Sequence, residues 1–265
     1  MTKVPVSDTP KPGEAKAGRD DPEFPKRREA AREKVNALDR GKVHSQPERT
    51  AFFNDVYVQA AGDAAYVPWA DMKPKDELVQ WLRENPGISS ASTSSPVPSA
   101  VDIACGLGDN AEAMAAAGYE TTAFDLSADA IDWAKRRFPE SPVKYCQADL
   151  FAPPEKWLKN FDLVHECFTL QALPPQMLGK TAAAIAALAA PGADLLVYTR
   201  WRKDGAPVDG PPWPLEESRL DCFAALGFER ITETRFTVEK AATADRPARV
   251  IPHAFTHWRR VTQVT

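Results

Sequence analysis

The chain has 265 residues, and 33 lysine and arginine residues stand against 37 aspartate and glutamate residues, a formal net charge of −4. Hydrophobic residues make up 43% of the chain and charged residues 26%, and a chain of this length buries about three quarters of its unfolded surface on folding. The acidic balance argues against a strongly basic nucleic-acid-binding or membrane-surface protein.

Membrane and secretory signals are weak. The longest apolar run, Ala182–Ala190, is much shorter than the about 18 residues of a membrane span, and residues 1–12 hold no apolar segment of a signal peptide. We therefore expect a soluble, cytoplasmic protein. Its cysteines form no C-x-x-C pair, so we expect reduced thiols. These are Cys105, Cys146, Cys167 and Cys222.

Three segments follow one another along the chain. Residues 1–25 are rich in Pro, Lys, Gly and Asp and predict a disordered tail. Residues 26–99 predict an N-terminal helical cap that ends in a Ser- and Pro-rich linker, Ile88–Ser99. Residues 100–265 predict the main domain. Within the cap, helices are expected at Lys26–Leu38, from Pro47 through Tyr57, and at Lys75–Glu84.

Short apolar runs alternate with helical patterns from Ala100 onward. This alternation predicts a Rossmann-like, doubly wound α/β sheet that is mostly parallel and covered by helices on both faces. Strands are expected at Ala100–Ala104, Glu120–Phe124, Val143–Gln147, Phe161–His165 and Ala193–Thr199, and helices at Asn110–Ala117, Ser127–Phe138, Gln176–Ala190 and Glu216–Leu226. Two further runs, Phe228–Val238 and Val250–Val261, predict a closing pair with an antiparallel C-terminal strand.

A glycine turn joins the first strand of the main domain to its first helix. It spans Ala104–Gly108, and its glycines let the backbone approach a ligand at the carboxyl end of the sheet. Asp125 ends the next strand, 17 residues after Gly108, where a carboxylate accepts hydrogen bonds from ribose hydroxyls. Asp149 and Leu150 follow the third strand and offer a carboxylate and backbone amides to a purine ring.

Two classes of cofactor use this layout. A dinucleotide places its phosphates at the N-terminus of the first helix, where Asp109 would repel them. Asp102 lies inside the motif and suits a sulfonium cation better than phosphates. The sequence therefore favours S-adenosylmethionine. A nicotinamide-dependent oxidoreductase stays an alternative, as does a non-catalytic cofactor-binding module whose basic N-terminal arm recruits a partner.

Residues 100–261 resemble a class I S-adenosylmethionine-dependent methyltransferase. The glycine turn, Asp125 and Asp149-Leu150 carry the resemblance, and Ala104 stands where the family usually has its first glycine. The resemblance implies S-adenosylmethionine as cofactor and methyl transfer as activity. It also implies that the methionine moiety is lined by Asp102, Ala104, Gly106 and Gly108, and that the adenosine moiety contacts Asp125, Leu126, Asp149 and Leu150.

A narrower resemblance, to the thiopurine and halide/thiol methyltransferase group, rests on three short segments. Pro68-Trp69 precedes the sheet, Glu166–Pro174 follows the fourth strand, and Gly210–Pro214 follows the fifth. The glycine that this group has shortly after the tryptophan is replaced by Ala70-Asp71-Met72. The resemblance implies a small acceptor with a thiol or another soft nucleophile.

Further candidate site residues lie at the same edge of the predicted sheet. Trp69 is a candidate wall of the cofactor pocket, because a sulfonium cation favours an aromatic face; a core anchor is the alternative. Glu166 ends the fourth strand at the ligand edge and is a candidate cofactor contact. Arg200, Trp201 and Arg202 follow the fifth strand and are candidates to bind an anionic substrate, with a solvated loop as the alternative. Trp213 is a further candidate to bind the substrate.

Other classes of site are not indicated. His253 and His257 share one face of a strand without a carboxylate cluster beside them, so no metal is predicted. Methyl transfer from a sulfonium needs alignment of the reactants, so no catalytic residue is assigned. The fourth strand ends in His165–Phe168 and lacks the Asp/Asn-Pro-Pro-aromatic tetrad of nucleobase methyltransferases. We therefore expect a small-molecule substrate, with neither nucleic acid nor membrane as partner.

Overall fold

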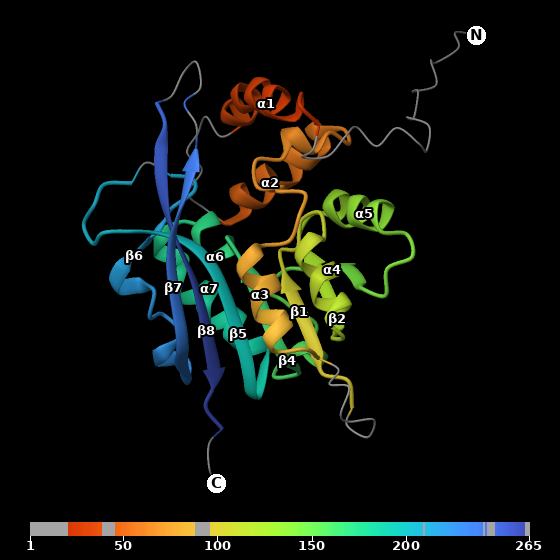
Figure 1. Cartoon of the computed structure of the whole chain (residues 1–265), viewed down its shortest axis with the longest axis vertical. Helices are drawn as coiled ribbons and strands as arrows, with labels where there is room; N and C mark the ends of the chain where they lie inside the picture. The colour runs from red at the N-terminus through yellow and green to blue at the C-terminus, as the bar shows by residue number, and fades with distance from the viewer. Residues whose placement is uncertain are drawn as a thin grey trace.

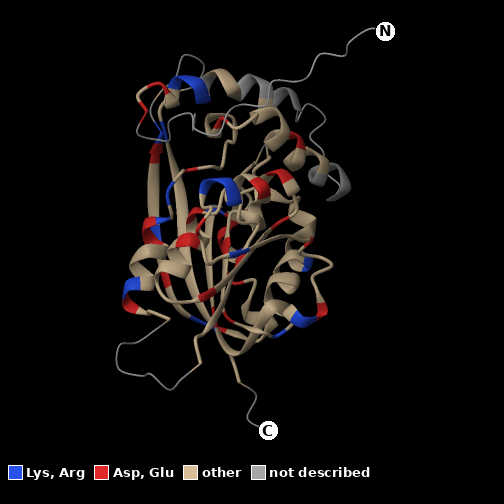
Figure 2. Ribbon diagram, turned by 90° about the vertical axis from the view of Figure 1, so that its right-hand side faces the viewer, with Lys and Arg blue, Asp and Glu red and all other residues tan. Residues whose placement is uncertain are grey.

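The computed structural model describes residues 21–38, 46–87, 96–208, 210–240, 242 and 247–262. Most of the predicted tail, residues 1–25, and residues 88–95 of the predicted linker lie outside the described residues. No helix among the described residues is both long and apolar enough to cross a membrane. Lys and Arg residues are interspersed with Asp and Glu residues over the helices and strands (Figure 2).

The centre of the fold is a sheet of eight strands. They are β1 (Ser99–Ile103), β2 (Glu120–Asp125), β3 (Lys144–Gln147), β4 (Phe161–Cys167), β5 (Ala189–Arg202), β6 (Leu215–Glu216), β7 (Phe228–Lys240) and β8 (Arg249–Arg260). The order is β3-β2-β1-β4-β5-β8-β7, with β6 paired to β5 (Figure 1). Strands β1 to β5 are parallel, and β8 runs antiparallel to β5 and β7. This confirms the predicted fold class.

Helices cover both faces of the sheet. One face carries α3 (Asp76–Glu84), α4 (Asp109–Ala116) and α5 (Ala128–Arg137). The other carries α6 (Thr169–Ala172) and α7 (Leu178–Leu188). Side chains alternate along each strand, so Val101 and Ile103 join the core under α7, whereas Ala100 joins the core under α3.

The N-terminal helices α1 (Phe24–Leu38) and α2 (Gln46–Ala60) lie at the top of the molecule in Figure 1. Their apolar side chains bury one another and also pack on the glycine turn and α5. This cluster includes Phe24, Phe52, Val56, Tyr57, Leu107, Ala130 and Trp133. The cap is therefore docked on the part of the sheet edge where the glycine turn lies.

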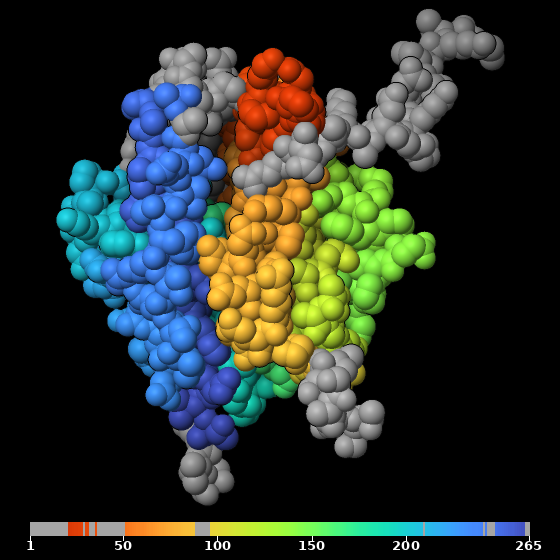
Figure 3. Space-filling model, in the orientation of Figure 1, coloured from red at the N-terminus to blue at the C-terminus, as the bar shows by residue number. Residues whose placement is uncertain are grey.

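The third helix of the predicted cap packs directly on the sheet. Leu78, Trp81 and Leu82 of α3 are buried and contact Ala100 of β1 and Leu196 of β5 within one apolar cluster. In Figure 3 the orange surface of α3 lies between the blue C-terminal strands and the green helices. Burying each of these side chains contributes about 1.5–3 kcal/mol, so α3 is held as firmly as the helices of the main domain.

Local signals explain where α5 begins and ends. The Ser127 hydroxyl accepts a hydrogen bond from the Ala130 amide at 3.4 Å and caps the helix. Asp129 lies in the first turn and Arg136 and Arg137 in the last, which complements the helix dipole at both ends. The helix predicted from Ser127 is thus present.

The helix predicted at Glu216–Leu226 is wrong. The segment instead holds two 3-10 turns, Glu217–Arg219 and Ala224–Leu226. Leu220 and Phe223 lie between the two turns, and both are buried in the core.

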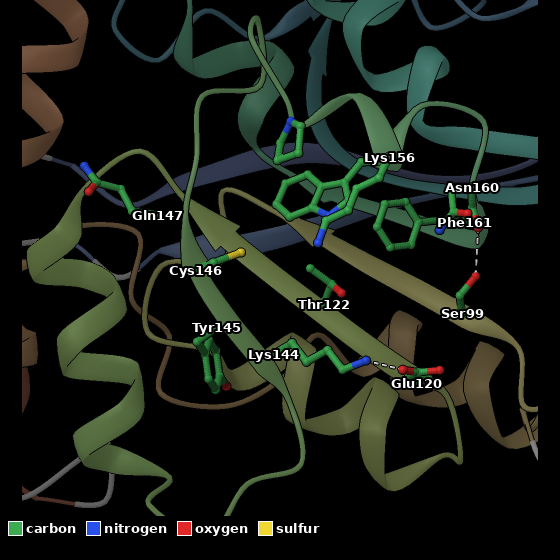
Figure 4. Close-up of a pocket in the computed structure, with 12 residues that line it drawn as sticks. Ser99, Glu120, Thr122, Lys144, Tyr145, Cys146, Gln147, Lys156, Asn160 and Phe161 are labelled. Atoms are coloured by element: carbon green, nitrogen blue, oxygen red, sulfur yellow. Dashed lines mark hydrogen bonds and ion pairs between the residues drawn. The ribbon is translucent and has the colours of Figure 1, made fainter.

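The connection from β3 to β4, residues 148–160, contains no α-helix, although all of it is described. Trp157 from its single 3-10 turn packs on Phe124 of β2. A cavity of about 500 Å³ remains beside it on this face, lined by Thr122 and Cys146 among others (Figure 4). None of its lining residues belongs to the glycine turn.

Replacing Gly108 by alanine tests how closely the glycine turn, Ala104–Gly108, packs against Tyr145. Gly108 has φ 91°, and a Cβ there would lie 2.3 Å from the Tyr145 hydroxyl. We expect Gly108→Ala to lower the unfolding free energy by about 2–4 kcal/mol, measured by urea denaturation. Gly205→Ala is the matched control, because Gly205 also has a positive φ of 70° but has no atom within 4 Å of the added Cβ. Equal losses in the two variants would contradict the packing argument.

Candidate active site

The glycine turn follows the end of β1 and leads into α4. Ala104, Gly106 and Gly108 all have positive φ, at 50°, 55° and 91°, so the backbone curls sharply before the helix. Ala104 is exposed, whereas Gly106 and Gly108 are buried. The turn therefore presents its first residue to the outside and packs the later two against the protein.

Asp125, at the end of β2, holds the turn in place. Its Oδ2 accepts a hydrogen bond from the Gly106 amide and its Oδ1 one from the Ser127 amide, each at 3.0 Å. The side chain is 7% exposed, and burial raises the pKa of Asp125 to about 6 against the effect of these amides. A carboxylate offers about four acceptor positions, so this group still has capacity for two hydroxyl donors.

An aromatic pair from the cap lies over the turn. The Trp69 indole donates a hydrogen bond to the Tyr57 hydroxyl at 2.7 Å. A Cβ at Gly106 would lie 3.1 Å from that hydroxyl and 4.0 Å from Trp69 Cδ1. We call Tyr57 and Trp69 the roof. The Ser127 hydroxyl donates to Asn54 Oδ1 at 3.1 Å, which ties α2 to the start of α5 beside Asp125.

Sequence reasoning proposed Trp69 but not Tyr57 or Asn54 as a site residue. The available signal was the aromatic spacing of Phe53 and Tyr57 on one helix face, which fits a core as well as a site. Only the packing of α2 on the turn distinguishes the two.

Asp102 lies beside the turn but is directed away from it. Its Oδ1 is 2.7 Å from His165 Nδ1, and both side chains are almost fully buried. Asp102 Oδ2 and His165 Nε2 have no hydrogen-bond partner among the described residues. The methionine-lining role predicted for Asp102 would therefore act through its charge, not through direct contact.

Asp109 proves to be compensated. Its two carboxylate oxygens accept hydrogen bonds from both terminal nitrogens of Arg137, at 2.7 and 2.8 Å. This bidentate pair is mostly buried. The argument that Asp109 repels a pyrophosphate therefore loses its force, and the preference between cofactors rests on the other carboxyl groups.

The residues predicted for the adenine end lie after β2 and β3. Asp149 Oδ1 accepts a hydrogen bond from the Phe151 amide at 2.9 Å, and the Leu126 carbonyl accepts one from the Gln147 side chain at 3.0 Å. Leu150 is buried in the core beneath the sheet. Its side chain thus serves packing, and Asp149 is the polar group of this pair.

Glu166 is a buried carboxyl at the end of β4. Its Oε2 accepts hydrogen bonds from the Thr169 and Leu170 amides at the start of α6, at 2.9 and 3.3 Å. Oε1 is buried and has no partner in the described part of the chain. Burial raises the pKa of Glu166 to about 8, although the two amides oppose this.

The structure does not bring together three of the predicted substrate residues, Arg200, Trp201 and Trp213. The Arg200 guanidinium lies over the Phe168 ring. Trp201, next along β5, packs on the opposite core and lies under Arg235. Trp213 is buried and its amide donates to the Gln171 carbonyl at 2.7 Å. Of the three, only Arg200 contacts Phe168, which follows Glu166 at the end of β4.

The described residues contain no group of three or more His, Cys, Asp or Glu side chains arranged to hold a metal. His253 Nδ1 lies 2.8 Å from the Ile251 carbonyl, and His257 Nε2 lies 2.7 Å from Asp194. Both histidines thus have partners within β5 and β8.

Glu166→Gln tests the burial of this carboxyl. Because the folded-state pKa is raised from 4.5 to about 8, the ionised form is disfavoured in the folded protein. The associated stability is present below about pH 4.5 and is lost as pH rises towards 8. We measure the free energy of unfolding by urea denaturation at pH 5 and at pH 8.5. Between these pH values, we expect it to fall by about 2–4 kcal/mol more in the wild-type protein than in Glu166→Gln. Glu229→Gln is the control: it replaces an exposed carboxyl of β7 and should keep the wild-type pH dependence. If the unfolding free energy of all three proteins changes equally with pH, the raised pKa does not belong to Glu166.

Comparison with known proteins gives a family model and a fold. Residues 100–192 match the model for a methyltransferase domain, and no curated protein matches the sequence. A structure reported for the conversion of a disulfide bond into a thioacetal group during echinomycin biosynthesis is 19% identical with a TM-score of 0.62, over 82% of this chain and 94% of the other. A putative methyltransferase from Bacillus halodurans is 14% identical with a TM-score of 0.57, over 69% and 99%. Magnesium protoporphyrin IX methyltransferase from Synechocystis, with bound S-adenosylmethionine, is 17% identical with a TM-score of 0.50, over 70% and 77%.

The matched segment begins at β1 and ends within β5, and it contains the glycine turn, Asp125 and Asp149. The strand order and the antiparallel β8 belong to the same fold as the solved methyltransferases. Residues 100–192 are therefore similar to a methyltransferase domain, on a fold shared with solved methyltransferases, and S-adenosylmethionine is the cofactor.

Proposed function

We propose that the protein methylates a small-molecule acceptor at a thiol or another soft nucleophile. Asp125 is the main support for the proposed cofactor site. Its buried carboxyl is fixed by the Gly106 and Ser127 amides beneath the roof. Its position after the second parallel strand suits the two hydroxyls of a ribose.

The residues present fit S-adenosylmethionine. Glu166 Oε1 and Asp102 Oδ2 are buried acceptors without partners among the described residues, and both lie at the ends of strands next to the turn. The negative charge of Asp102 favours a sulfonium cation over a pyrophosphate, and a bound sulfonium would favour ionisation of Glu166, whose pKa burial raises to about 8. Trp69 adds an aromatic ring, which also favours a cation.

Each residue has a distinct task in this proposal. S-adenosylmethionine supplies a methyl group that its sulfonium charge already activates. Asp125 holds the ribose hydroxyls, and Asp149 accepts a hydrogen bond from the adenine amino group. Tyr57 and Trp69 close over the turn and exclude water. Alignment of nucleophile, methyl carbon and sulfur is the main contribution left to the protein.

A soft nucleophile is supported by the local segments and by one structural neighbour. The Gly210–Pro214 turn resembles that of the thiopurine and halide/thiol group, and its Gly210-Pro211 and Pro211-Pro212 bonds are cis. The neighbour from echinomycin biosynthesis is described by chemistry on sulfur. Lys75 lies beside Cys167 after β4 and lowers the pKa of that thiol, although burial raises it overall. The same cation would favour the thiolate form of an acceptor.

The alternative functions make different predictions. An oxidoreductase would need its dinucleotide phosphates near the buried carboxylates of Asp102 and Asp125, which is electrostatically unfavourable. A non-catalytic module would bind the cofactor but would not turn over any acceptor. Ligand binding and turnover therefore separate all three.

Asp125→Asn tests the cofactor site. Loss of two charge-assisted hydrogen bonds predicts at least about 30-fold weaker binding of S-adenosylhomocysteine in isothermal titration calorimetry. Asp129→Asn is the control, since Asp129 is exposed in the first turn of α5 and its loss should leave the affinity unchanged. Tighter binding of NADH than of S-adenosylhomocysteine would overturn the proposal.

An acceptor series tests the nucleophile. Thiophenol, phenol and aniline share one ring and differ in the accepting atom. We expect release of S-adenosylhomocysteine to be fastest with thiophenol and to rise with pH as thiolate forms, because sulfur reacts as the thiolate. A faster reaction with aniline or phenol would reject the soft-nucleophile assignment.

A further inference from the structure

Two cations meet over one aromatic ring beyond the glycine turn. Lys75 Nζ lies 4.6 Å from the Phe168 ring centroid and 4.8 Å from that of Tyr198. The Arg200 guanidinium carbon lies 5.3 Å from the same Phe168 centroid. These residues come from the start of α3, the end of β4 and β5, so three separate elements converge here. We call Lys75, Arg200, Phe168 and Tyr198 the cation cluster.

The cation cluster adjoins the cofactor site. The Lys75 amide donates a hydrogen bond to Asn110 Oδ1 at 3.0 Å, and Asn110 is the second residue of α4, directly after the glycine turn. Phe168 follows Glu166 by two residues and has φ 68°, a conformation that a bulky residue rarely adopts. Its amide donates to the Tyr198 carbonyl at 2.9 Å. The strained backbone directs this ring between the two cations.

The charges in the cation cluster are only partly compensated. Lys75 forms an ion pair with Asp71. The Arg200 guanidinium makes no ion pair in the described part of the chain, and its buried Nε has no hydrogen-bond acceptor there. Burial, followed by the nearby Arg249, lowers the pKa of Arg200. Within the cation cluster Lys75 is thus paired with Asp71, whereas the Arg200 guanidinium has no carboxylate within ion-pair distance among the described residues.

Neutral aromatic groups surround these cations. His253 stacks on Phe236 with centroids 5.6 Å apart and an interplanar angle of 19°. Burial lowers the pKa of His253 to about 4, so the ring is neutral near pH 7, and its Nδ1 donates to the Ile251 carbonyl. Phe168 and Tyr198 also contact His253. An aromatic ligand would meet apolar faces beside the cations.

We infer that the cation cluster binds a carboxylate of the methyl acceptor, with Arg200 as the principal contact and Lys75 as the second cation. The inference rests on the proposed function and names its substrate class, an aromatic acid that bears the nucleophile. A guanidinium matches a carboxylate with two parallel hydrogen bonds, and the Nε of Arg200 is the donor for which the described residues provide no partner. The neighbouring rings would pack on the acceptor ring.

Ligand binding without turnover tests the inference on the full chain. Benzoate and benzamide are titrated calorimetrically into protein saturated with S-adenosylhomocysteine. These two probes have the same ring and nearly the same shape, but only benzoate is charged. We expect benzoate to bind at least about tenfold more tightly than benzamide, and Arg200→Gln to remove this preference. Arg259→Gln is the control, because Arg259 is an exposed arginine of β8 paired with Asp194.

Each other outcome has a defined meaning. Equal affinities for benzoate and benzamide, or an unchanged preference in Arg200→Gln, would overturn the inference. If Arg200→Gln does not fold, Arg200→Lys replaces it; an intermediate preference is expected because the charge stays but the paired hydrogen bonds are lost, and an unchanged one overturns the inference. Failure of S-adenosylhomocysteine to bind would instead reject the proposed function, and would be seen before either probe is added.

Discussion

Buried carboxyl groups at the carboxyl ends of three parallel strands are the constraint on which the site depends. Asp102, Asp125 and Glu166 are 1%, 7% and 0% exposed, and a buried charge is costly unless it is paired or hydrogen-bonded. Each is stabilised differently. Asp102 is paired with His165. Asp125 accepts hydrogen bonds from the Gly106 and Ser127 amides. Glu166 accepts hydrogen bonds from two amides at the start of α6. The local backbone geometry of the turn and of α6 is thus coupled to these charges.

The edge of the sheet is divided by charge. The carboxyl groups lie on β1, β2 and β4, and the cation cluster lies at the start of α3, the end of β4 and β5. A positively charged methyl donor and a negatively charged acceptor would each meet the opposite charge, and the nucleophile would be held between them. Coulomb interactions are stronger in such a partly buried site than in water. The arrangement therefore provides both binding and orientation without an acid–base pair.

The sequence was sufficient for elements whose signal is local. Short stretches of sequence were enough to predict three features: the alternation of strands and helices, the Ser127 cap and the glycine turn. Their predicted positions agree with the structure. The predicted Glu216–Leu226 helix was wrong: the segment has a helix-compatible composition but forms two 3-10 turns, with the buried Leu220 and Phe223 between them. Partners distant in sequence were not accessible to local patterns. Asp109 and Arg137 are 28 residues apart, and Lys75 meets Phe168 only through the packing of α3 on the sheet.

The candidate site residues divide into those inside and those outside the segment that matches the methyltransferase domain model, residues 100–192. Asp102, Asp125, Asp149 and Glu166 all fall within the segment that matches the methyltransferase domain model. Tyr57, Trp69, Lys75, Arg200 and His253 all fall outside it. In the proposed function, the first set serves the cofactor. The second set supplies the roof and most of the cation cluster, so our proposal places acceptor recognition on the N-terminal cap and on β5 and β8. Tyr57 lies against Gly106, Lys75 bonds to Asn110 of α4, and Asn54 bonds to Ser127 beside Asp125. If the proposed site is correct, a change of acceptor specificity therefore requires substitutions in the cap as well as in the sheet.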